Sequence, residues 1–207
     1  QVNELRAPAR VDRCLQKIAP SREHFEILSA PGAMGAQACG ALGLPHRVVD
    51  IAHTPISEAE DTKSAVTTIC KQGVDLLLFA GGDGTARDVL DAIPQQQVVL
   101  GIPCGVKMHS GVFAVSPEAA GELLLRLIRA GLVNLQQREV RDIDEVAFRE
   151  GQVRAKFYGE MLVPEEGHFL QHTKVSGVES DELISHDIAA AVVERSSQDV
   201  LYIIGPG

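Results

Sequence analysis

The chain has 207 residues, a formal net charge of −9, and 45% hydrophobic and 23% charged residues, which is typical of a globular protein with one large domain or two small ones. The acidic balance argues against binding to nucleic acid or to an anionic membrane surface, and six Phe, two Tyr and no Trp offer few platforms for stacking bases. The four cysteines are far apart in the sequence, which predicts reduced thiols in a cytoplasmic protein rather than a disulfide framework or a zinc site.

Strands alternate with helices at the start of the chain. Val11, Cys14, Leu15 and Ile18 recur at helical spacing, which predicts an amphipathic helix. Short strands are expected next, at 25–29 and 47–51. This alternation is typical of an α/β fold.

A buried parallel sheet is expected after these elements. Ser57 to Glu60 has the pattern of a capping box that begins a helix, and Gly73 is its natural end. The continuous apolar runs 76–80 and 98–102 flank a short helix. A strand, helix and strand at this spacing predict a βαβ unit whose strands are covered on both faces.

The sequence changes character near Val133. Ser116, Pro117 and Glu118 are favourable residues for the start of a long helix. Alternating apolar residues between 146 and 157 then predict an antiparallel hairpin, and a helix at 181–195 and a strand at 200–204 complete the chain. We therefore expect an α/β domain over 1–133 and a β-rich domain over 134–207.

Residues Gly81-Gly82-Asp83-Gly84-Thr85 follow the buried strand and precede a helix. Ligands bind at this position in open α/β sheets, glycines let a phosphate approach the backbone, and the helix offers free N–H groups. Thr85 is expected to cap that helix. One interpretation of Asp83 is a Mg²⁺ ligand or an acceptor of a substrate proton; the other is a tight turn in which Asp83 accepts backbone N–H groups.

Polar residues after the second buried strand are candidates for the same site. Lys107 is placed to neutralise phosphate charge, and His109 and Ser110 are placed to contact a nucleotide. The alternative is an ordinary loop held by local hydrogen bonds. Arg87 and Asp91, at i and i+4, predict a surface ion pair. His168 and His172 have the i, i+4 spacing of some metal sites, but no third ligand is evident, so no protein-bound metal is predicted.

Two features concern the setting of the chain. The longest uncharged apolar run, 98–106, is much shorter than the roughly 18 residues that span a membrane, so no membrane partner is expected. The chain does not begin with Met and ends at Gly205-Pro206-Gly207 directly after an apolar strand. We expect it to be part of a longer protein.

The stretch LLLFAGGDGTARDVLDAI resembles the phosphate-donor signature of the ATP-NAD kinase family, and its GGDGT turn is shared with lipid and sugar-phosphate kinases. The stretch VVLGIPCGVKMHSGVFAVSPEAAGELL is similar to one branch, the predicted ATP- or polyphosphate-dependent NAD kinases and the acetoin-catabolism protein X group. The resemblance implies an N-terminal Rossmann-like α/β domain facing a β-rich C-terminal domain, which would be incomplete here, and a homo-oligomer.

The resemblance also implies a function. Gly81, Gly82, Gly84 and Thr85 would bind the phosphates of ATP or polyphosphate. Asp83 would act on the 2′-hydroxyl of the NAD adenosine ribose, as a base or through Mg²⁺, to give NADP. An Asn-Glu pair that contacts NAD in better-known members has no clear counterpart here. The alternatives are therefore a non-catalytic nucleotide-binding accessory protein and a kinase for a lipid or another small alcohol.

Overall fold

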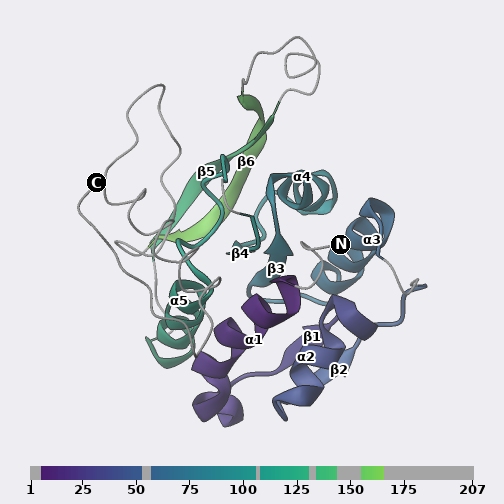
Figure 1. Cartoon of the computed structure of the whole chain (residues 1–207), viewed down its shortest axis with the longest axis vertical. Coiled ribbons are helices and arrows are strands. Elements are labelled where there is room, and N and C mark those ends of the chain that lie inside the picture. The colour runs from purple at the N-terminus through teal and green to yellow at the C-terminus, as the bar shows by residue number, and fades with distance from the viewer. Residues whose placement is uncertain (1–5, 53–56, 106–107, 131–133, 144–154, 166–207) are drawn as a thin grey trace, which may run out of the picture. The chain divides into compact units, whose positions relative to one another are not determined.

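The computed structural model describes residues 6–52, 57–105, 108–130, 134–143 and 155–165 (Figure 1). All of them lie in one compact unit, Gln1–Thr173, and a second unit spans Lys174–Gly207. The helix expected at 181–195 and the strand expected at 200–204 lie outside the described residues. The domain boundary expected near Val133 stays a prediction.

The N-terminal elements follow the expected order. Helix α1 begins the described chain, and Cys14, Leu15 and Ile18 on one face of it are buried. Strands β1 and β2 pair in parallel, with Ile27 opposite His46. The elements are α1 Arg6–Ile18, the 3₁₀ turn Ala19–His24, β1 Ile27–Ser29, the 3₁₀ turn Gly32–Met34, α2 Ala36–Ala41 and β2 His46–Val48.

The two buried strands are confirmed as a parallel pair. β3 (Leu77–Gly81) and β4 (Val99–Pro103) run side by side, with Leu77 opposite Val99 and Gly81 opposite Pro103. Helix α4 (Asp83–Ala92) connects them. Because β3 and β4 are parallel, their carboxyl ends meet at one edge, directly beside the start of α4.

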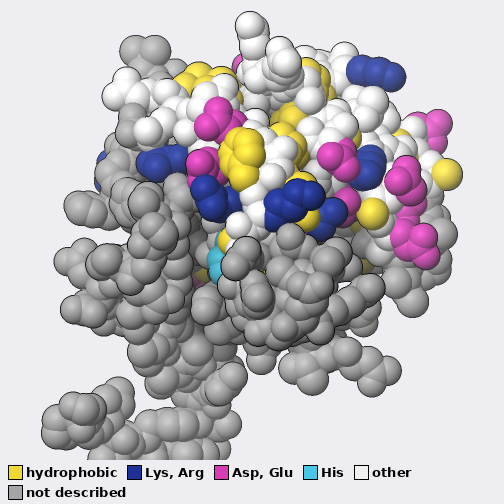
Figure 2. All heavy atoms as spheres, turned by 90° about the horizontal axis from the view of Figure 1, so that it is seen from above, with side chains coloured by type: hydrophobic (Ala, Val, Ile, Leu, Met, Phe, Trp, Pro, Cys, Tyr) yellow, Lys and Arg dark blue, Asp and Glu magenta, His cyan; other side chains and the backbone are white. Residues whose placement is uncertain are grey.

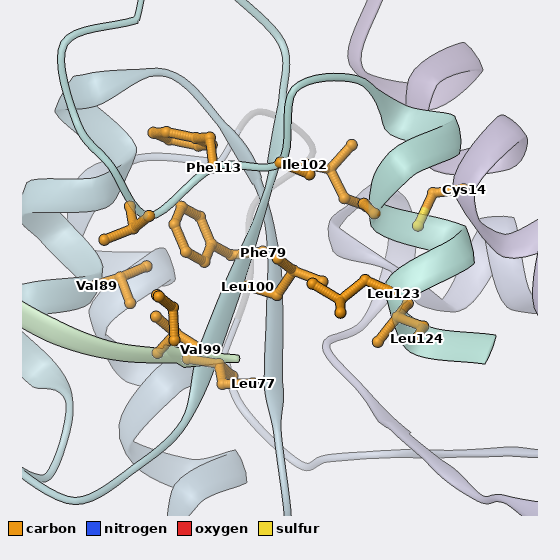
Figure 3. Packing of buried hydrophobic residues seen from close by; sticks show 14 of the residues in the cluster. Cys14, Leu77, Phe79, Val89, Val99, Leu100, Ile102, Phe113, Leu123 and Leu124 are labelled. Atoms are coloured by element: carbon orange, nitrogen blue, oxygen red, sulfur yellow. The ribbon is translucent and has the colours of Figure 1, made fainter. Parts of the chain in front are cut away.

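Helices cover both faces of this strand pair (Figure 3). Val89 of α4 lies on the side of Phe79, while Leu123 and Leu124 of α5 lie with Cys14 of α1 on the other side. The rings of Phe79 and Phe113 meet edge to face, with 5.3 Å between their centroids. These layers bury Leu77 and Phe79 of β3, while Ala80 and Gly81 at its carboxyl end stay partly exposed.

Two helix starts test the expected caps. The Ser116 hydroxyl accepts the Ala119 N–H at 3.0 Å and caps α5 (Pro117–Ala130), as predicted. Helix α3 (Ala59–Cys70) has its capping box one residue later than predicted, with Glu58 at the N-cap and Asp61 accepting the Glu58 N–H at 3.0 Å. The two side chains of this capping box are therefore the carboxylates of Glu58 and Asp61, and the Ser57 hydroxyl is not the helix cap.

The structure has an antiparallel strand pair, here termed the hairpin, whereas the first strand and the turn of the predicted hairpin, at 146–151, lie outside the described residues. β5 (Asn134–Ile143) pairs with β6 (Ala155–Glu165), with a bulge where the register passes from Val140 to Arg141. The strand at 134–143 was missed because its polar residues hide the alternation. The hairpin packs on α4 (Figure 1). None of the described helices has the length and apolar character needed to cross a lipid bilayer.

Candidate functional site

The GGDGT turn joins the end of β3 to the start of α4. Gly82 is the extended N-cap residue, with φ −114° and ψ −170°, and the helix begins at Asp83. Thr85 therefore lies inside the helix and is not its cap, which corrects the prediction. The Thr85 side chain instead lies over Gly81, so that a Cβ at Gly81 would overlap with it.

The backbone at this turn is open where a phosphate would approach. A Cβ added at Gly82 or Gly84 would meet no protein heavy atom within 4 Å. The first amides of a helix have no carbonyl partner within it, and the helix dipole is positive at that end. The Ala86 N–H, which bonds the Gly82 carbonyl at 3.0 Å, begins the intrahelical ladder. The turn can therefore offer N–H groups to an anion.

Asp83 is fixed by the loop that follows β4. The His109 N–H donates to its Oδ2 at 2.7 Å and the Ser110 N–H donates to its Oδ1 at 3.0 Å. Asp83 is only 8% exposed. The second interpretation of Asp83 in the sequence was a carboxylate that accepts hydrogen bonds from backbone N–H groups, and these bonds are present in the structure. Each carboxylate oxygen has a further lone pair, so these bonds leave acceptor capacity for a substrate hydroxyl or a metal ion.

The loop itself is held by the hairpin. The Ser110 hydroxyl donates to the Arg141 carbonyl at 2.8 Å and accepts the Arg141 N–H at 3.0 Å. The Gly111 N–H donates to the Glu139 carbonyl at 2.9 Å. Ser110 is buried, with 1% exposed, whereas His109 is half-buried. Ser110 was predicted to contact a nucleotide, whereas in the structure its hydroxyl forms hydrogen bonds with the backbone of Arg141.

A buried cation lies at the same edge of the sheet. Arg10 of α1 donates from Nη1 to the Pro103 carbonyl at 2.7 Å, and Pro103 lies opposite Gly81 in the strand register. Sequence reasoning missed Arg10. Its signal was a charged residue four positions before Cys14, on the apolar stripe of an amphipathic helix. Lys107, the predicted cation, lies outside the described residues.

Arg87 has a different partner from the one predicted. Its Nη1 lies 3.0 Å from Asp142 Oδ2 on β5, and its guanidinium lies 4.3 Å from the centre of the Tyr158 ring. The hydrogen bond with Asp142 raises the pKa of Arg87. Asp91, the predicted partner, instead pairs with Lys63 at 3.1 Å. Arg87 thereby ties α4 to the hairpin one helical turn beyond Asp83.

The charged side chains near the site are of both signs, namely Asp83, Arg10 and the pair of Arg87 with Asp142. On the face of the molecule drawn in Figure 2, Lys and Arg side chains also lie beside Asp and Glu. Among the residues that the structure describes, no group of three or more His, Cys, Asp or Glu is placed to hold a metal ion. A divalent cation here would depend on a bound phosphate for most of its ligands.

Three of the four cysteine thiols have a raised pKa because they are buried. Burial, with a smaller contribution from Glu118, raises the pKa of Cys14 to about 12. Burial also raises the pKa of Cys39 and of Cys70. Cys104 is nearest to the turn, where its N–H donates to the Gly81 carbonyl at 2.9 Å and its thiol contacts the Ile102 carbonyl.

Comparison with known proteins shows sequence similarity to kinases. The model of the ATP-NAD kinase N-terminal domain matches residues 4–133. Two curated relatives, each named diacylglycerol kinase, from Mycobacterium tuberculosis strains CDC 1551 / Oshkosh and ATCC 25618 / H37Rv, are each 30% identical over 104 residues. Those matches cover 47% of this chain, which spans about a third (34%) of the relatives' length. No solved structure matches the chain.

Proposed function

This chain belongs to the ATP-NAD kinase family, and we propose that it is a phosphotransferase that moves a phosphoryl group from ATP or polyphosphate to NAD, giving NADP. The observation that carries the proposal is the open backbone of Gly82 and Gly84 at the start of α4, directly beside the fixed carboxylate of Asp83. A phosphate-binding turn and a proton acceptor are two of the parts that enzymes use for phosphoryl transfer to an alcohol.

The donor is proposed to bind at the start of α4. Its phosphates would accept hydrogen bonds from the backbone N–H groups of the turn. The absence of side chains at Gly82 and Gly84 leaves free space there, which a phosphate can fill. The protein carries a net charge of −9, so the donor also needs cations. Lys107 is proposed for this role from its place in the sequence. The Arg10 guanidinium, which lies at the end of β4, is proposed as the second cation.

The transfer step can be written with its atoms balanced. The ribose 2′-hydroxyl oxygen of NAD attacks the terminal phosphorus and forms a P–O bond. The bond between that phosphorus and the bridging oxygen breaks, and ADP or a polyphosphate shortened by one unit leaves. Asp83 accepts the hydroxyl proton, as its remaining lone pairs allow. The hydrogen bonds from His109 and Ser110 hold the carboxylate in one orientation throughout.

Mg²⁺ fits this site as a partner of the donor. Mg²⁺ is commonly held by one or two carboxylates together with substrate phosphates, and Asp83 is a carboxylate with acceptor capacity beside the phosphate turn. When bound, Mg²⁺ would neutralise charge on the donor phosphates. The family resemblance and the excess of acidic residues favour its use.

A lipid kinase is the second candidate. The two curated relatives are named diacylglycerol kinase, and the GGDGT turn would serve any alcohol acceptor equally well. The match to the ATP-NAD kinase domain spans more of the chain, residues 4–133, than the 47% aligned with those relatives. This difference favours NAD as the acceptor.

A non-catalytic nucleotide-binding protein of the same fold is the third candidate, because the Asn-Glu pair of better-known members has no clear counterpart here. A cytoplasmic location and a homo-oligomeric state also belong to the proposal. NAD and ATP are both cytoplasmic, and the family resemblance favours an assembly of identical chains.

An acceptor panel tests the proposal. The full-length protein is incubated with Mg²⁺ and either ³²P-labelled ATP or labelled polyphosphate, and with NAD, NADH, diacylglycerol vesicles or a sugar phosphate. Label in NADP supports the proposal and identifies the donor. Label in lipid alone overturns it in favour of the lipid kinase, and nucleotide binding by calorimetry without any product supports the binding protein.

A further inference from the structure

We propose that Ser110 is a positioning residue, whose buried hydroxyl anchors the Asp83-binding loop to strand β5, so that the hairpin sets the place of the Asp83 carboxylate. The inference rests on the proposed function for its catalytic consequence. It gives the hairpin, which lies beyond the residues 4–133 that match the family domain, a direct part in the site.

The Ser110 hydroxyl makes two hydrogen bonds to the backbone of one residue of β5. It donates to the Arg141 carbonyl at 2.8 Å and accepts the Arg141 N–H at 3.0 Å. The hydroxyl thus bonds both the carbonyl and the N–H of one residue of β5, as a paired residue of a neighbouring strand would. Because Ser110 is 1% exposed, water cannot easily replace either bond.

The same residue reaches Asp83 through its backbone. The Ser110 N–H donates to Asp83 Oδ1 at 3.0 Å, and the preceding N–H, from His109, donates to Oδ2 at 2.7 Å. One residue therefore contacts β5 with its side chain and Asp83 with its main chain. Loss of the hydroxyl leaves the Gly111 N–H, on the Glu139 carbonyl, as the remaining bond of this loop to β5. The two amides can then shift, and the carboxylate shifts with them.

A second link reinforces this arrangement. Asp142, the neighbour of Arg141 on β5, forms an ion pair with Arg87 of α4 at 3.0 Å. Arg87 lies one helical turn after Asp83, on the same side of α4. The strand thus holds α4 through Asp142 and the loop through Ser110. Asp83 lies where these two attachments meet.

The chain offers a matched control. Ser116 also uses its hydroxyl for one structural bond, accepting the Ala119 N–H at 3.0 Å at the start of α5. Ser116→Ala removes a serine hydroxyl and a backbone contact, as Ser110→Ala does, but it has no contact with Asp83 or its loop. A loss of activity that arises only from general destabilisation would appear in both variants.

Steady-state kinetics of the full-length protein test the inference. Ser110→Ala should lower kcat by about tenfold to a hundredfold, the effect of a displacement near 1 Å, with the KM for the donor within about twofold. Ser116→Ala should keep the wild-type kcat, and Ser110→Thr, which retains the hydroxyl, should recover most of it. Ser110→Ala should also have no further effect in an Asp83→Asn background, because it acts through that carboxylate. A wild-type kcat in Ser110→Ala, or equal losses in both backgrounds, would overturn the inference.

Hydrogen exchange separates this inference from the proposed function. In the wild type, peptides that cover 108–111 should exchange as slowly as β4, and exchange there should accelerate in Ser110→Ala but not in Ser116→Ala. Fast exchange at 108–111 in the wild type overturns the anchoring role, even if no serine variant folds. Slow exchange in a wild type that phosphorylates no acceptor supports the anchor and contradicts the proposed function alone.

Discussion

The Ser110 N–H donates to Asp83 Oδ1 at 3.0 Å, although the two residues are 27 positions apart in the sequence. The bond joins the first turn of α4 to the loop after β4, at the edge where the carboxyl ends of β3 and β4 meet. A carboxylate held in this way is fixed before any substrate arrives, and preorganisation of this kind favours catalysis because no reorganisation is then needed.

Substitution of Asp83 should affect turnover and stability together. Asn at this position keeps one carbonyl oxygen for the two amides and turns an N–H₂ group towards the other donor, which should cost about 1–3 kcal/mol of unfolding free energy. Loss of the proton acceptor should lower kcat by at least about a hundredfold. Urea unfolding and initial rates check the two effects. Asp91→Asn, a surface carboxylate paired with Lys63, should leave kcat unchanged.

Alanine substitutions at the glycines of the turn should have different effects on stability and on donor binding, depending on the position. Gly81→Ala should destabilise the fold by about 1–3 kcal/mol, because the added Cβ overlaps with the Thr85 side chain. Gly84→Ala meets no atom within 4 Å and should raise stability by up to about 1 kcal/mol, yet raise the KM for the donor. Gly40→Ala, an equally open helical position in α2, is the control for stability without a donor effect. If Gly84→Ala had the wild-type KM for the donor, the turn would not be part of the donor-binding site.

The ion pair between Arg87 and Asp142 should stabilise the contact of α4 with the hairpin. A double-mutant cycle with Arg87→Met and Asp142→Asn should give a coupling free energy of about 0.5–1 kcal/mol in urea unfolding. The pair of Lys63 and Asp91, in which the carboxylate is 60% exposed against 21% for Asp142, should give a smaller coupling and serves as the comparison. Equal couplings in the two pairs would show that partial burial of Asp142 contributes nothing.

Stability should fall in alkaline solution because of buried thiols. The pKa of Cys14 is raised from 9.0 to about 12 in the folded protein, so between these values the unfolded chain loses its proton while the native thiol keeps it. The contribution is fully present below pH 9 and is lost as the pH rises towards 12, by about 1.4 kcal/mol per pH unit. Cys14→Ala should flatten the decline in unfolding free energy between pH 9 and 11. An unchanged slope would contradict the raised pKa.

The local parts of the fold, and the strand that leads into the site, could be predicted from the sequence. The apolar run before Gly81 predicted β3, and the Ser116 cap followed from residue type and spacing. The neighbouring strand β4 also followed, because parallel strands joined by a short helix pair in a known way. These features depend on contacts between residues that are close in the chain, or on general rules of connection.

The long-range parts could not be predicted. Ser110 meets the backbone of Arg141, and a backbone group carries no signal of residue type. Arg87 had a plausible partner at i+4 in Asp91, but Asp142 is the nearer acid once β5 packs on α4. The start of α4 was also placed wrongly, because the helix begins at Asp83 and the Thr85 side chain lies over Gly81 instead of capping the helix.

The most direct test compares NADP formation by the full-length wild type and by its Asp83→Asn variant. Both are assayed with NAD and Mg²⁺, and with ATP or polyphosphate as donor, after circular dichroism has shown that both are folded. The account predicts NADP from the wild type and at least a hundredfold slower formation by Asp83→Asn. Equal rates for the two proteins, or no NADP from the folded wild type with either donor, would contradict it.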